Sequence, residues 1–196
     1  TLPSGSPTSG SPAVQKIKLS QILKQGDDTE VEFLSDEIVA IGYGRWEANF
    51  GLEKRPAEDV DVTVEQLSCV KHLLDSNRVP YLDFSIWGPY GHRIERRLRL
   101  AGQLLQADGT FRNAEIAGPP TLEVWCGCFD VMQTAFIMLE VLDLGTMVEY
   151  RKLICDYHAT YGSSCWLLLY QTETRFRLEH LERMRRAAAT AHELSL

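Results

Sequence analysis

Arginine is the residue type in this chain whose clustering could do chemistry, because guanidinium groups neutralise the phosphates of a nucleic acid. One group of arginines follows a glycine-containing turn, and a second lies in the run RFRLEHLERMRR near the end of the chain. We predict that these two groups bind a nucleic acid or a protein partner. They are Arg93, Arg96, Arg97 and Arg99 in the first group, and Arg175, Arg177, Arg183, Arg185 and Arg186 in the second.

The second arginine group has two interpretations that the sequence leaves open. Residues 175–186 carry five arginines against Glu179 and Glu182, a net charge of +3. Cations near the end of a helix are stabilised by its dipole, and Glu179 is spaced to pair with Arg183. The group is therefore either a solvated face that pairs with itself, or a surface for RNA, single-stranded DNA or an acidic partner. The acidic segment 27–37 of this same chain is one candidate partner.

An aromatic and glycine-rich stretch, DFSIWGPYGHR, precedes the first arginine group. Aromatic rings beside arginines could stack on nucleic-acid bases. Alternatively, Phe84 and Trp87 fill the core, the glycines form a tight turn, and the arginines line the open face of a hairpin. The residues predicted to form this structural motif are Asp83, Trp87, Gly88, Pro89 and Gly91.

The sequence predicts no catalytic residue, metal site or cofactor. Cys126 and Cys128 stand two residues apart in a predicted helix, so their sulfurs point about 200° apart around its axis. We expect these thiols to pack as small apolar groups. An enzymatic alternative would require the fold to bring His92 together with Asp83 or Cys69.

Charge is unevenly distributed along the chain. The net charge of -7 argues against a uniformly basic nucleic-acid binder, while 44% apolar residues predict a folded chain. Residues 1–65 carry six basic and twelve acidic side chains, whereas 91–118 and 151–196 are each net +2. Any nucleic-acid contact must therefore come from a local basic region.

The five cysteines form no evenly spaced framework, which predicts a reducing, intracellular compartment, without distinguishing cytoplasm from nucleus. No apolar run reaches the roughly 18 residues of a membrane span, and no signal peptide is visible. The chain starts at Thr1 without a methionine, so we expect a fragment, a processed product or a trimmed chain.

The elements that must position these residues are mainly helical. Apolar residues recur at helical spacing in the second half, which predicts three antiparallel helices at about 122–141, 145–160 and 164–190. Thr63 and Gln66 form a capping-box pattern before a helix at about 64–76, and a further helix is predicted over roughly 37–49. The Asp108-Gly109 pair predicts a β-hairpin with strands at about 95–105 and 110–116. The predicted fold class is mainly α with a small β-hairpin (α+β) and a C-terminal three-helix antiparallel arrangement.

Composition divides the chain into three regions. Residues 1–15 are a tail rich in Ser, Pro and Gly, which we expect to be disordered. Residues 16–62 are an acidic segment with short helices, in which 16–33 is either helical or extended. Residues 63–196 are the predicted main domain.

Three segments carry a resemblance, which spans residues 63–187. They are VPYLDFSIWGPYGHRIERRLRL, AGPPTLEVWCGCFDVMQTAFIMLEVLDLGTMVEYRKLI and YGSSCWLLLYQTETRFRLEHLERMRR. Together they resemble a domain that recurs in proteins of dinoflagellate algae, often beside retrotransposon-type polyprotein segments. The residues on which the resemblance rests are Pro80, Asp83, Trp87, Gly88, Pro89, Gly91, Trp125, Phe136, Leu139, Tyr150, Trp166 and the final EHLERMRR.

The resemblance implies a retroelement-associated protein with a capsid or nucleic-acid-packaging part, and it supplies no catalytic residues. The chain also lacks the Cys-His knuckle that many packaging proteins carry. We therefore expect a non-enzymatic helical module that self-associates and binds single-stranded nucleic acid weakly. The alternative is a protein-protein adaptor, docking through the acidic N-terminal segment or through the acidic helix at 121–149, with no nucleic-acid role.

Overall fold

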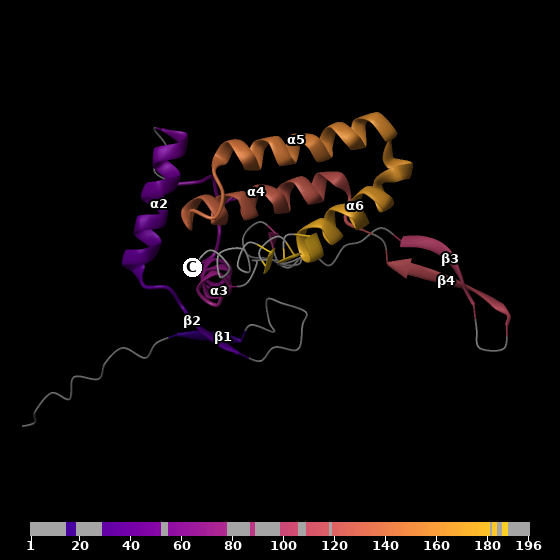
Figure 1. The fold of residues 1–196 in the computed structure, drawn as a ribbon, viewed down its shortest axis with the longest axis horizontal. Helices are drawn as coiled ribbons and strands as arrows, with labels where there is room; N and C mark the ends of the chain where they lie inside the picture. Colours follow the sequence, from indigo (N-terminus) through magenta and orange to yellow (C-terminus); the bar gives the residue numbers. More distant parts are fainter. Residues whose placement is uncertain are drawn as a thin grey trace, which may run out of the picture.

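The computed structural model describes residues 15–18, 29–51, 55–77, 87–88, 99–105, 109–117, 119–180, 182–183 and 186–187. These ranges contain five α-helices and two small antiparallel sheets of two strands each (Figure 1). The predicted mainly helical fold with a small β-hairpin is therefore confirmed. The helices are α2 (Asp36–Phe50), α3 (Val64–Asp75), α4 (Leu122–Met138), α5 (Leu144–Tyr161) and α6 (Trp166–Arg175).

The first sheet pairs β1 (Lys16–Lys18) with β2 (Glu30–Glu32), placing Ile17 opposite Val31. The sequence left the region 16–33 open between helix and extended chain, and the structure makes its described ends, 16–18 and 30–32, extended. Successive side chains of a strand point to opposite faces of the sheet. In β2, Val31 is therefore buried, whereas Glu30 and Glu32 on either side of it are exposed. The backbone N–H of Leu34 then donates to Ser68 Oγ at 3.0 Å, which ties the sheet to α3.

Helix α3 begins as its sequence predicts. The N–H of Gln66 donates to Thr63 Oγ1 at 3.3 Å, and the N–H of Thr63 donates to Gln66 Oε1 at 2.9 Å. This capping box satisfies two backbone donors that the first turn would otherwise leave unpaired. The helix buries Leu67, Val70 and Leu73 on one side.

The predicted hairpin is present as β3 (Arg99–Leu105) and β4 (Phe111–Ala117). The strands pair antiparallel from Arg99 opposite Ala117 to Leu105 opposite Phe111. Gly109 has a φ of 83°, a left-handed conformation that glycine adopts without steric cost. The hairpin extends away from the helices (Figure 1).

Helix α4 is the centre of the helical part, because α2, α3 and α5 all pack against it. Its core side includes Trp125, Phe129 and Phe136. Its start is capped by Thr121, whose Oγ1 accepts the N–H of Val124 at 3.3 Å. Helix α4 thus holds the other helices in place.

One predicted helix end is wrong. Helix α4 ends at Met138 and not near 141, because Glu140 turns left-handed with a φ of 54° and the N–H of Val141 donates to Phe136 O at 2.8 Å. The helix predicted over 164–190 changes geometry along its length, from a 3-10 turn at Ser163–Cys165 through the α-helix α6 to π-helical geometry over Phe176–His180, and its predicted end lies outside the described residues. Helical residues follow at 182–183 and 186–187.

Candidate interaction surface

The described arginines at the end of the chain are paired with glutamates one turn away. Arg175 Nε donates to Glu179 Oε2 at 3.0 Å, and Arg183 Nη2 donates to the same oxygen at 3.3 Å. Arg186 Nε donates to Glu182 Oε1 at 2.8 Å. The self-paired face that the sequence offered as one interpretation is therefore present. Such exposed pairs are worth only about 0.3–0.5 kcal/mol each, so they weaken the local positive potential without locking the side chains.

Arg177 has a different position, because it faces the interior. Only 7% of Arg177 and 3% of Glu173 is exposed, and Arg177 Nη2 donates to Glu173 Oε2 at 3.0 Å. Tyr150 of α5 donates its hydroxyl to Glu173 Oε1 at 3.3 Å. Burial, and after it the negative charge of Glu173, raises the pKa of Tyr150. Arg177 therefore belongs to a buried polar cluster between α5 and α6 and not to the exposed face.

Several predicted site residues lie outside the described residues. These are Arg93, Arg96, Arg97 and Arg185 among the arginines, and Asp83, Pro89 and Gly91 of the structural motif. Arg99 is the first residue of β3. Of the motif, the structure places Trp87 and Gly88, and Trp87 is 0% exposed. Burial makes Trp87 a core side chain, as the second interpretation of this stretch predicted, and leaves it no face for stacking on a base.

Of the three residues named in the enzymatic alternative, the structure describes only Cys69, and its surroundings do not favour catalysis. Cys69 is buried in α3, and burial, with a smaller contribution from Glu65, raises its pKa to about 11. Its thiol is therefore protonated at neutral pH and is a poor nucleophile. His92 and Asp83 lie outside the described residues. Within the ranges that the structure describes, no three His, Cys, Asp or Glu side chains are arranged to share a metal ion.

Exposed apolar side chains flank the turn from α5 into α6, on the end of α5 and the first turn of α6, a feature that the sequence analysis missed. We call this set the corner patch. Leu168 and Tyr161 are its most exposed members, at 67% and 62%. The rings of Tyr157 and Tyr161 stack with their centroids 6.2 Å apart. The corner patch consists of Tyr157, Tyr161, Leu167 and Leu168.

Helix geometry explains why Leu168, the most exposed member of the corner patch, points to the outside. The buried side of α6 is set by Trp166, whose indole Nε1 donates to Pro120 O at 2.6 Å. Leu168 follows two residues later, about 200° further around the axis, so it points away from the core. The run Leu167-Leu168-Leu169 indicates an exposed apolar side chain in the sequence itself, because three consecutive leucines cannot all face one side of a helix.

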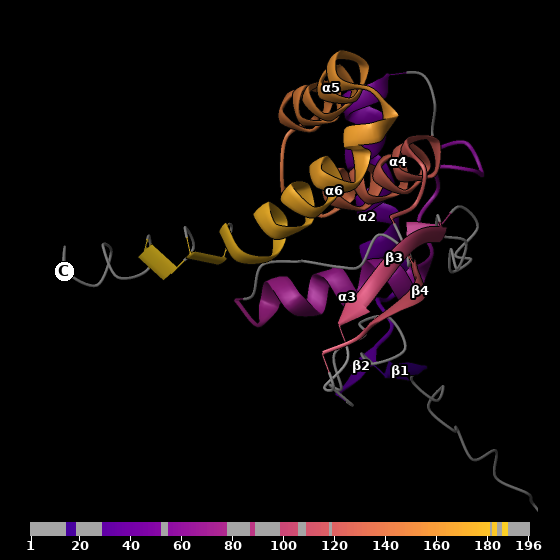
Figure 2. The ribbon, with the colours of Figure 1, turned by 90° about the vertical axis from the view of Figure 1, so that its right-hand side faces the viewer.

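In Figure 2, α6 runs from its junction with α5 toward the C-terminal end of the chain. Arg175 is the last residue of α6, and Arg183 and Arg186 follow it in the sequence, whereas Leu167 and Leu168 lie in the first turn of α6.

Among the described residues, no helix combines the length and the apolar composition that crossing a membrane requires. Comparisons with family models, with curated proteins and with solved structures find no match to this chain.

Proposed function

We propose that this chain is a non-enzymatic helical module that assembles with copies of itself through the corner patch. The observation that carries the proposal is the exposure of four large apolar side chains within a stretch of twelve residues, 157–168. Single exposed apolar residues are common on protein surfaces, but contiguous apolar surface marks interaction sites. Tyrosine is also enriched at the buried centres of interfaces. A self-complementary patch of this kind favours a two-fold symmetric contact.

Assembly also agrees with the packaging role that the resemblance to retroelement-associated domains implies. In that role, weak binding of single-stranded nucleic acid would come from Arg175, Arg183 and Arg186. Each of these arginines already lies beside a glutamate, so each phosphate contact has to compete with an existing ion pair. We therefore expect any such binding to be weak and to fall steeply with salt.

The test is Leu168→Glu, which puts a charge at the centre of the proposed contact. We expect the mass of the wild-type chain to rise with protein concentration, and Leu168→Glu to remain monomeric over the same range. The matched control is Ile41→Glu, which makes the same apolar-to-acidic change at an exposed position of α2, at the other end of the helical body from the junction of α5 and α6 (Figure 1). Light scattering after size exclusion gives the mass of each variant.

A wild-type chain that stays monomeric at every concentration would favour the adaptor alternative. If Leu168→Glu assembles to the same mass as the wild type, the contact between copies does not involve the corner patch. Replacing Arg175, Arg183 and Arg186 by glutamine tests the nucleic-acid part, through RNA affinity measured at two salt concentrations. An unchanged affinity and an unchanged salt dependence would remove that part of the proposal and leave assembly standing.

A further inference from the structure

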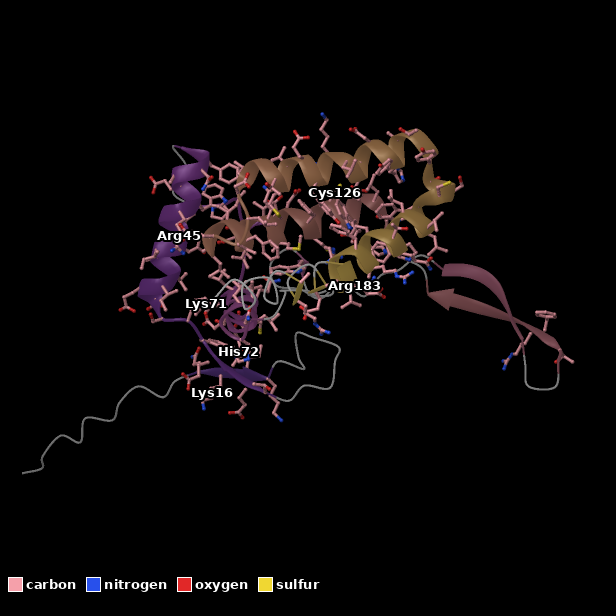
Figure 3. All side chains as sticks on the ribbon, viewed as in Figure 1. Lys16, Arg45, Lys71, His72, Cys126 and Arg183 are labelled. Atoms are coloured by element: carbon pink, nitrogen blue, oxygen red, sulfur yellow. The ribbon has the colours of Figure 1, made fainter. Side chains whose placement is uncertain are left out.

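Two cysteines from neighbouring helices meet at the contact between α4 and α5. Cys126 Sγ and Cys155 Sγ are 3.8 Å apart, although 29 residues separate them in the sequence. Cys126, labelled in Figure 3, lies on the side of α4 that faces α5. Both cysteines are partly accessible, whereas Cys69 and Cys128 are buried. The two sulfurs are therefore in van der Waals contact, and neither cysteine is fully buried.

We propose that Cys126 and Cys155 are a redox site that a low-molecular-weight disulfide converts into a reversible bond between α4 and α5. A disulfide bond is about 2.05 Å long, so each sulfur has to move by roughly 0.9 Å from the present contact. Bridging without movement of the backbone also requires the two Cα atoms to lie within about 7 Å of each other.

The proposed reaction is two successive thiol–disulfide exchanges. The thiolate of one cysteine attacks a sulfur of the reagent RSSR, which forms a mixed disulfide and releases one RS⁻. The thiolate of the other cysteine attacks the protein sulfur of that mixed disulfide, which forms the Cys126–Cys155 bond and releases the second RS⁻. Each RS⁻ takes up the proton that a cysteine has lost, so two protein thiols and RSSR give one protein disulfide and two RSH. Two electrons pass from the protein sulfurs to the reagent.

The surroundings of the pair limit its reactivity. Burial, then the neighbouring Cys155, raises the pKa of Cys126 to about 11, and the Arg151 guanidinium opposes that rise. Arg151 is held in place by Asp130, with Arg151 Nε and Asp130 Oδ1 2.9 Å apart. Cys126 is thus mostly protonated at neutral pH, so its exchange is slow there and accelerates as the pH rises. We therefore expect the two thiols to stay reduced under reducing conditions and to form the Cys126–Cys155 disulfide only when low-molecular-weight disulfides accumulate.

The experiment uses the full chain with Cys165→Ser, because the exposed Cys165 thiol could otherwise link two copies. The protein is incubated with oxidised glutathione, unreacted thiols are alkylated, and the mass and the unreduced peptide map are recorded. We expect a product that carries two fewer alkyl groups than the untreated, alkylated protein, with one linked peptide pair containing Cys126 and Cys155. We also expect the midpoint of thermal unfolding to rise by about 5–10 °C, and to return to its starting value after reduction.

Cys155→Ser in the same background is the matched variant, and its thermal unfolding should not depend on oxidised glutathione. Three results would overturn the proposal: full alkylation of Cys126 and Cys155 after prolonged exposure to excess reagent, a stable glutathione adduct on either residue, or a linked peptide pair that involves another cysteine. Each is read on the parental protein, so the conclusion does not depend on how well the serine variant folds.

Discussion

At the scale of single residues, the buried ion pair of Glu173 and Arg177 carries a large desolvation cost. Taking a carboxylate and a guanidinium out of water costs several kcal/mol per ion, and their mutual attraction must offset that cost. Glu173→Gln removes the carboxylate that Arg177 contacts, and we expect it to lower the free energy of unfolding by about 3–5 kcal/mol. Urea unfolding followed by circular dichroism measures this loss.

The control for this prediction is the double variant Glu173→Leu with Arg177→Met. Apolar side chains of similar volume avoid the desolvation cost, so the double variant should be clearly more stable than Glu173→Gln alone. If both proteins lose the same amount of stability, the packing of these side chains matters and their charges do not.

At the scale of elements, α2 contains two glycines whose surroundings differ. A Cβ added at Gly42 would lie 3.0 Å from Met138 Cε and 3.2 Å from Met138 Cβ, whereas one added at Gly44 would meet nothing within 4 Å. Alanine in a helix interior is favoured over glycine by about 0.5–1 kcal/mol. Gly44→Ala should therefore raise the free energy of unfolding by about that amount.

Gly42→Ala is the matched comparison, because it makes the same chemical change two residues away in the same helix. Gly42→Ala should raise the free energy of unfolding by less than Gly44→Ala, or should lower it. The added methyl group would force α2 and Met138 of α4 apart. Thermal unfolding of the two variants side by side gives the difference. Equal gains would show that Gly42 is not needed for the contact between these helices.

The elements that sequence predicts well are those with a local cause. The capping box of Thr63 and Gln66 starts α3, and the left-handed Gly109 lies between β3 and β4, and in each case residues a few positions apart determine the backbone. The helices α4 and α5 follow from apolar periodicity in the same way. Such signals act within one or two turns and do not depend on the rest of the fold.

The features that sequence does not predict depend on contacts between distant segments. Glu140 adopts a left-handed conformation that is unusual for its residue type, so nothing in the sequence indicates that α4 ends there. Arg177 belongs to an arginine-rich run that looks exposed, and its burial follows from the position of Tyr150 on another helix. The contact of Cys126 with Cys155 likewise exists only once α4 and α5 pack together.

At the scale of the whole molecule, one continuous core joins the first third of the chain to the rest. Val31, Trp46 and Val62 belong to the same buried cluster as Phe129 of α4 and Trp166 of α6. Helix α2 lies at the C-terminal end of α4, where Gly42 approaches Met138, whereas the junction of α5 and α6 lies at the other end of the helical body (Figure 1). A shared core of this kind makes the stability of each segment depend on the others.

We therefore expect the chain to unfold in a single transition, with urea curves from circular dichroism and from tryptophan fluorescence that superimpose. Trp46→Ala should lower the free energy of unfolding by about 3–5 kcal/mol and shift both curves equally, because Trp46 is only 5% exposed and contributes to the common core. Ile41→Ala is the control on the same helix. Ile41 is 56% exposed, so its loss should change stability by no more than about 0.5 kcal/mol. Two separate transitions, with only the earlier one shifted by Trp46→Ala, would mean that the N-terminal part unfolds independently of α4–α6.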